Sequence, residues 1–256
     1  MATVNSVRTT KYESNGASGE EEEHLFWRDH SRLVITPTAA PSVLGLFGFS
    51  AATLIVAGNI AGWYGPATHS GVYFAPFALV FGGIAQFLAG MWAFKARDAL
   101  ATAMHGMWGS FWIAYGIFWL MVGGKALTLP AGATHYFVSY GMWFVMLGLL
   151  TMIGAFAAIG KNLALFSTLG LLAAGSDLLA VGLLSGNTTF AVAAGWVLVA
   201  SVGAAVYTAS ALLLAESYGR TILPMLEFNK KANIPFRHPK QPIEYSGGMP
   251  GSRIGQ

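Results

Sequence analysis

The chain has no cysteine, and its centre has almost no charge. The missing thiols exclude a disulfide framework, a thiolate metal site and a cysteine nucleophile. From Leu44 to Leu214, 171 residues carry only six charged side chains. With 55% hydrophobic residues and a mean hydropathy of +0.56, this scarcity of charge excludes an ordinary soluble domain.

Catalytic patterns are also missing. The sequence has no paired carboxylates, no glycine-rich phosphate loop, and no His-x-x-x-His or Glu-x-x-His spacing on one helix. We therefore expect no enzyme activity, no metal and no cofactor. Of the six histidines, only His105 lies within a long apolar run, where a hydrogen-bonded structural role is more usual than proton transfer.

The six central charges divide the apolar region into regular lengths. Five of them lie where the chain must turn, namely Lys95, Arg97, Asp98, Lys125 and Lys161. The segments between are near the ~20 residues that cross a bilayer as a helix, and they are apolar on every face. Such runs must satisfy their own backbone hydrogen bonds, which excludes the alternating strands of a barrel. The pattern predicts an all-α integral membrane protein with six spans, near residues 44–63, 74–94, 100–122, 136–159, 163–184 and 190–214.

The distribution of basic residues predicts the topology. With the N-terminus inside, thirteen Lys and Arg residues lie on the cytoplasmic side and only Lys125 lies opposite. Both termini are therefore expected in the cytoplasm, of either a bacterial inner membrane or a eukaryotic plasma membrane. We divide the chain into a disordered tail (1–40), a transmembrane domain (41–218) and a proline-rich tail (219–256). With this apolar centre, the basic tails do not indicate nucleic-acid binding.

Polar side chains inside the spans are the candidate functional residues. Ser50, Thr53, Asn59 and Gln86 can either line a substrate path or hold helices together, as polar residues commonly do in membranes. Asp177 is the sixth charge and lies in the middle of the fifth span. We expect it to be a buried acid, either carrying protons or forming structural hydrogen bonds.

An aromatic stripe runs along the third span. Trp108, Trp112, Tyr115 and Trp119 follow one another at i, i+4, i+7 and i+11, so they share one helix face. The stripe is either a packing face between helices or protomers, or a face whose cytoplasmic end narrows a pore.

Three separated motifs resemble one family. Phe81 to Trp112 reads FGGIAQFLAGMWAFKARDALATAMHGMWGSFW, Leu44 to Phe49 reads LGLFGF, and Tyr218 to Pro224 reads YGRTILP. In this order, and with six spans, they resemble the acetate uptake transporter family, which includes the succinate–acetate permeases. The resemblance covers residues 40–228.

The resemblance implies a specific architecture. Members are six-helix protomers, each with its own pore, that assemble as hexamers and move acetate and sometimes succinate. Their pores narrow at an apolar constriction built from the first, third and fifth helices, which here implies Phe49, Trp108 and Leu172. Trp108 replaces the tyrosine that is common in the family.

The expected function is therefore transport of small carboxylates, acetate and possibly succinate, with proton linkage left open. The spans contain no basic residue that could hold an anion too tightly for rapid exit. Two alternatives stay open: a channel for a small neutral solute such as ammonia or urea, and a non-transporting membrane scaffold or acid-stress sensor. The expected partners are the carboxylate, the lipid bilayer and other copies of the chain in a homo-hexamer.

Overall fold

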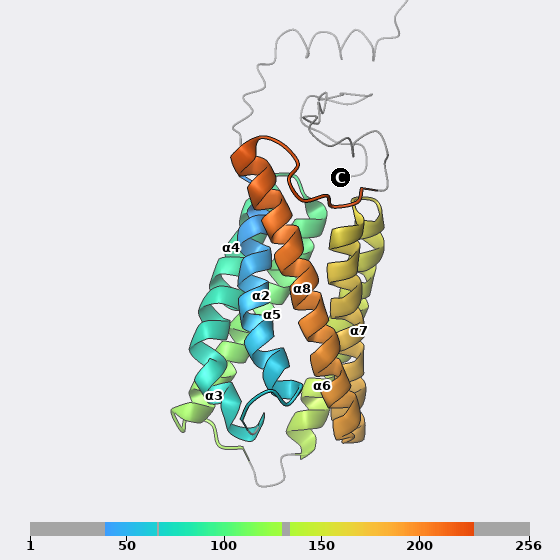
Figure 1. Ribbon diagram of the computed structural model, residues 1–256. Coiled ribbons are helices and arrows are strands. Elements are labelled where there is room, and N and C mark those ends of the chain that lie inside the picture. The colour runs from blue at the N-terminus through green and yellow to red at the C-terminus, as the bar shows by residue number, and fades with distance from the viewer. Residues whose placement is uncertain (1–38, 66, 130–133, 228–256) are drawn as a thin grey trace, which may run out of the picture. The chain divides into compact units, whose positions relative to one another are not determined.

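Six membrane-length helical spans make up the described part of the chain. The computed structural model describes residues 39–65, 67–129 and 134–227, and the spans run through these ranges (Figure 1). Five are single helices: α2 (Pro41–Ile60), α5 (Ala99–Gly123), α6 (Thr134–Ile159), α7 (Leu163–Ser185) and α8 (Thr188–Tyr218). The predicted number and order of spans is confirmed. The sequence placed the end of the sixth span four residues too early, because α8 continues to Tyr218.

The second span is a composite. It consists of α3 (Ala67–Phe77), a π-helical segment η1 (Ala78–Ala85) and α4 (Gln86–Lys95). Pro76 lies inside α3 and cannot donate a backbone hydrogen bond, which favours a local change of helix type. The sequence predicted a span near residues 74–94 here and gave no sign of the change of helix type. π-Helical turns are found most often near functional sites, and this one leads directly into Gln86.

Side-chain caps set several helix ends. Asp98, Asn162 and Asn187 precede α5, α7 and α8, and each accepts a hydrogen bond from a backbone N–H two or three residues ahead, at 2.9–3.0 Å. Gly186 and Gly219 end α7 and α8 with φ of 69° and 63°, a left-handed conformation that glycine adopts without a steric penalty. These polar and glycine positions explain why the spans break where they do.

The helices pack in a definite order. Within the described residues, α6 lies along α7, α7 along α8, α8 along α2, and the η1–α4 segment along both α2 and α5 (Figure 1). One apolar cluster runs through the middle, with buried side chains from α2, α5, α6, α7 and α8. The candidate path residues therefore lie in a closely packed, mainly apolar interior.

The chain after α8 turns back onto the bundle. Leu163 and Ala164 donate backbone hydrogen bonds to the carbonyls of Leu226 and Met225 at 3.0 and 3.2 Å, and the Tyr207 hydroxyl donates to the Pro224 carbonyl at 2.7 Å. The first residues of the predicted C-terminal tail are thus fixed to α7 and α8. The rest of that tail, and the N-terminal tail up to residue 38, lie outside the described residues, so the proposed domain division stays a prediction.

Candidate functional site

Two of the three predicted constriction residues are in direct contact. The Phe49 ring of α2 and the Trp108 ring of α5 meet edge to face, with centroids 6.3 Å apart. Leu172 of α7 belongs to the same buried cluster, and each of the three side chains is at most 3% exposed. Helices one, three and five of the predicted spans therefore bring these residues into one core.

The indole of Trp108 is fixed by a residue that sequence reasoning missed. Its Nε1 donates a hydrogen bond to Oγ1 of Thr151 at 3.0 Å, and the Thr151 hydroxyl donates to the Leu147 carbonyl at 2.6 Å. Thr151 has no exposed surface. Its only sequence signal was a hydroxyl within an apolar span, and many such hydroxyls bond only their own helix.

The aromatic stripe packs inside the protomer. Trp108, Trp112 and Tyr115 are buried, and Phe111 contacts all three, with ring centroids 5.0–6.2 Å apart. Phe111 also meets Phe144 of α6 edge to face at 5.5 Å. The buried rings of the stripe therefore pack against other helices of the protomer, and Phe111, outside the predicted stripe, lies at their centre. The other interpretation, a face that narrows a pore, stays a prediction.

The predicted path residues are all buried, but they differ in their hydrogen bonds. Ser50 donates to the carbonyl of Leu46 within its own helix at 2.7 Å. Asn59 Nδ2 donates to the Tyr64 carbonyl at 2.6 Å, which holds the turn after α2 and favours a structural role. In contrast, Thr53 Oγ1 and Gln86 Oε1 are buried with no hydrogen-bond partner among the described residues.

Two further buried polar atoms without a described partner belong to α5. They are Nδ1 of His105 and Nε1 of Trp112. Buried polar atoms are nearly always hydrogen-bonded, so four such atoms on neighbouring helices need a ligand or water to satisfy them. We call Thr53, Gln86, His105 and Trp112 the polar column.

Close contacts between helices order the polar column along the bundle. A Cβ added to Gly45 of α2 would lie 2.5 Å from the His105 ring, and one added to Gly48 would lie 3.6 Å from the Gln86 backbone nitrogen. A Cβ on Gly82 would meet both Ala52 and the Trp112 ring, at 2.5 and 2.7 Å. The column therefore follows successive turns of α2, from His105 past Gln86 to Trp112.

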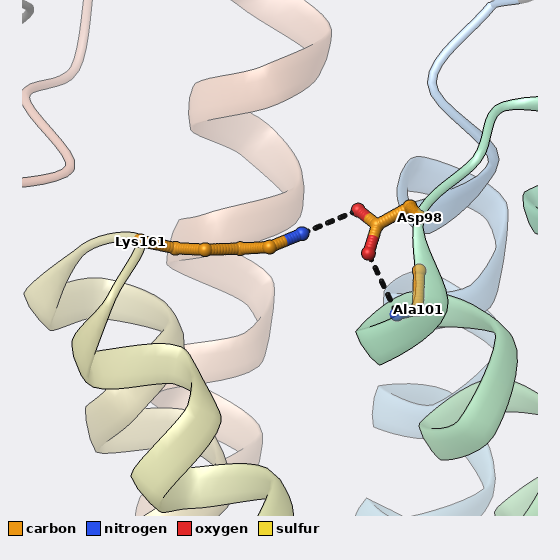
Figure 2. A network of polar contacts seen from close by, with 3 residues as sticks. All are labelled: Asp98, Ala101 and Lys161. Atoms are coloured by element: carbon orange, nitrogen blue, oxygen red, sulfur yellow. Dashed lines mark hydrogen bonds and ion pairs between the residues drawn. The ribbon is translucent and has the colours of Figure 1, made fainter. Parts of the chain in front are cut away.

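An ion pair closes one end of the bundle. Lys161, in the turn between α6 and α7, donates to Asp98 at 2.6 Å, and Asp98 also caps α5 through the Ala101 N–H (Figure 2). Partial burial raises the pKa of Asp98, but the hydrogen bonds from Ala101 and Lys161 and the nearby Lys161 and His105 charges outweigh it, so the pKa is lowered overall. We call this end the Asp98 end.

The comparison with known sequences decides the family. The sequence profile of the GPR1/FUN34/yaaH family matches residues 29–230. The chain belongs to the GPR1/FUN34/yaaH family. This confirms the resemblance drawn from the LGLFGF, FGGIAQ and YGRTILP motifs, and with the six spans it makes the protein a multi-pass integral membrane protein.

Relatives in the GPR1/FUN34/yaaH family carry transport names. The chain is 30% identical to the succinate-acetate/proton symporter SatP of Escherichia coli K12 over 195 residues, covering 75% of this chain and 97% of SatP. It is 30% identical to acetate permease A of Emericella nidulans, over 50% of this chain and 44% of the permease. The solved structure of the bacterial acetate channel SatP is similar with a TM-score of 0.67 and 26% identity, covering 74% of this chain and 99% of that one.

The position of Asp177 differs from the one expected from the sequence. We expected a buried acid, but its side chain is exposed on the outer face of α7 within the protomer. It lies against Gly148 of α6, where an added Cβ would collide with the carboxylate. Within the protomer the expectation of burial is wrong, because Ser176, its neighbour in the chain, points into the bundle from α7. The proton-carrying or structural role of Asp177 stays a prediction. Within the described residues, no group of three His, Cys, Asp or Glu side chains could hold a metal ion.

Proposed function

We propose that this protein transports acetate, and related small carboxylates such as succinate, through a path inside each protomer. The observation that carries the proposal is the polar column, which sets unsatisfied buried polar atoms beside the contact between Phe49 and Trp108. The names of the relatives, a succinate-acetate/proton symporter and an acetate permease, support the same substrate class.

The polar column suits an anion that must leave water. A bare carboxylate in hydrocarbon is very costly, so a path must replace its hydration with hydrogen-bond donors. The Trp112 indole and the Thr53 hydroxyl can each donate a hydrogen bond to the carboxylate, whereas the unpartnered Gln86 oxygen is an acceptor that suits a water or a protonated acid. None of these groups carries a fixed positive charge, so each site binds weakly enough to release the anion.

The aromatic contact suits a gate. Phe49, Trp108 and Leu172 are almost fully buried, so a solute can pass only when these side chains move apart. Apolar constrictions of this kind control passage by size and by exclusion of water. Such a gate favours acids of two to four carbons over larger ones.

Assembly and orientation complete the proposal. We propose that both termini are cytoplasmic, following the basic residues, and that protomers form a hexamer. The exposed position of Asp177 supports an oligomer, because a carboxylate facing lipid in the middle of a span is costly and a second copy would cover it. An apolar hollow of about 260 Å³, lined by Ala51, Ile55, Phe77 and Phe81, lies on another part of the outer face.

Reconstitution tests the function directly. Purified protein in liposomes should take up radiolabelled acetate faster than empty vesicles, and unlabelled succinate should compete. Trp108→Ala should change the rate or the size selectivity, whereas Ser110→Ala is the matched control, since Ser110 is exposed on the same helix. Uptake equal to that of empty vesicles would refute acetate transport. Added protonophore tests proton linkage, because a coupled transporter loses accumulation when the proton gradient collapses.

The neutral-solute alternative makes a different prediction in the same vesicles. A channel for ammonia or urea would conduct those solutes without competition from acetate. Acetate-sensitive flux supports the carboxylate assignment, and acetate-insensitive ammonia or urea flux supports the alternative. A scaffold or sensor would show neither flux.

A further inference from the structure

His105 is the member of the polar column that carries a titratable side chain. It lies on α5, is 5% exposed, and its Nδ1 has no hydrogen-bond partner among the described residues. A buried imidazole nitrogen that bonds nothing is costly, so a purely structural histidine would be expected to have found a partner.

The imidazole is held in place by backbone rather than by polar contacts. Gly45 of α2 lies directly against the ring, and an added Cβ there would be 2.5 Å from both Cε1 and Nδ1. Only glycine therefore leaves room for the ring at this position. The contact fixes the ring and brings α2 to its Nδ1 edge without supplying a hydrogen-bonding group.

The position of His105 on α5 places it beside the proposed gate. His105, Trp108 and Trp112 follow at i, i+3 and i+7, so they share one face of the helix. Three residues correspond to a rise of about 4.5 Å, which puts His105 nearly one turn from Trp108, toward the Asp98 end. On the proposed path, a solute that passes the gate in that direction would reach the imidazole next.

None of the charged side chains around His105 forms a hydrogen bond with its Nδ1 among the described residues. The helix facing it, α2, contains no ionisable residue, and α4 contributes only Lys95, which lies over the Trp92 ring at 5.3 Å. Asp98 caps the start of the same helix, two turns from His105, and its carboxylate already accepts a hydrogen bond from Lys161 in the α6–α7 turn. On α7 and α8 the acids are Asp177 and Glu216, both exposed. His105 is thus the group left to meet a negative charge between this end and the gate.

We propose that His105 is a carboxylate-binding residue of the transport path, which donates a hydrogen bond from Nδ1 to the transported anion on the Asp98 side of the contact between Phe49 and Trp108. The inference rests on the proposed function and adds a specific binding residue to it. A protonated imidazole donates from both nitrogens and forms a charge-assisted hydrogen bond, so binding strengthens as the imidazole gains a proton. Unlike a lysine, the imidazole can lose that charge and release the anion.

Two substitutions at one position separate binding from packing. His105→Phe keeps a flat ring against Gly45 but removes the hydrogen bond, and His105→Gln keeps a donor that does not titrate. In liposomes, we expect His105→Phe to raise the KM for radiolabelled acetate about tenfold, as for the loss of one hydrogen bond to a charged group. We expect His105→Gln to recover much of the affinity and to lose the change of KM with pH that titration of the imidazole gives the wild type, measured over a range from acid to neutral pH.

The controls distinguish the two levels of the proposal. Ser110→Ala should keep the wild-type KM and pH profile, and thermal unfolding in detergent reports whether each variant is folded. Wild-type protein that takes up no acetate would refute the proposed function itself. Wild-type uptake together with a wild-type KM in His105→Phe would overturn only the role of His105. If His105→Phe is unfolded, a His105→Gln variant with the wild-type pH profile overturns it equally.

Discussion

Trp108 donates a hydrogen bond across the bundle from its indole Nε1 to Oγ1 of Thr151, at 3.0 Å. This bond joins α5 to α6, two helices that otherwise share little backbone contact. It also leaves the proposed gate residue with a fully satisfied N–H, in a region where four other buried polar atoms have no described partner. The bond therefore holds Trp108 in its contact with Phe49, so opening of the proposed gate requires that Phe49 or Leu172 move or that this bond break.

Thr151→Val should destabilise the protein by about 1–3 kcal/mol. The change keeps the shape of the side chain but leaves the buried Trp108 N–H without an acceptor. Thermal unfolding in detergent measures the loss. Thr151→Ser, which restores the hydroxyl, should return most of the stability. Equal stability of the Val variant and the wild type would show that the bond is not formed.

The ion pair at the Asp98 end should make a small, acid-sensitive contribution to stability. Because the folded-state pKa of Asp98 lies below the ordinary value of about 3.9, its contribution is present above that value and is lost as pH falls through the lowered pKa. Asp98→Asn keeps a helix cap but removes the pair with Lys161. We expect a loss of at most about 1 kcal/mol at neutral pH, since both side chains are partly exposed.

Melting temperatures at neutral pH and at about pH 3 test this sign. The difference in melting temperature between wild type and Asp98→Asn should narrow as the pH falls, because protonation of Asp98 progressively removes the pair in the wild type. Added salt at neutral pH should narrow it too, by screening the charges. A gap that widens in acid would contradict the assignment.

Asp177→Asn should leave acetate uptake and its pH dependence unchanged. The carboxylate lies on the outer face of α7, whereas the polar column belongs to α2, α4 and α5. Uptake measured across the same pH range as for the His105 variants gives a direct comparison. Loss of uptake, or a shifted pH profile, in Asp177→Asn would instead make Asp177 the proton-carrying acid.

Gly148→Ala should destabilise the contact between α6 and α7 through Asp177. The added Cβ would collide with the carboxylate, so the side chain must move. In an Asp177→Ala background the same change should cost about 0.5–3 kcal/mol less, which a double-mutant cycle on thermal unfolding measures. Gly170→Ala is the matched control, since a Cβ at Gly170 of α7 meets nothing within 4 Å. Additive effects of the two changes would show that the residues do not interact.

The functional roles of the candidate residues stay predictions, but the structure shows how the side chains are placed. Thr53 and Gln86 were predicted as path residues because amides and hydroxyls are costly inside a span, and both have a buried unpartnered atom. His105 was interpreted as structural because a single histidine carries no spacing signal. Its proposed role rests on the missing hydrogen-bond partner of Nδ1, which depends on how the other helices pack around the ring.

The sequence by itself determined the membrane class, the six spans and the family. Charged residues are excluded from the hydrocarbon, so their spacing along the sequence marks the spans, and the order of the motifs along the sequence identifies the family. The tertiary structure decided which side chains face inward. A helix turns 100° per residue, so a small rotation puts Ser176 inside and Asp177 outside, and no one-dimensional pattern sets that rotation in a span that is apolar all round. The same packing placed Gly45 against His105 and Thr151 against Trp108, contacts between residues 60 and 43 positions apart.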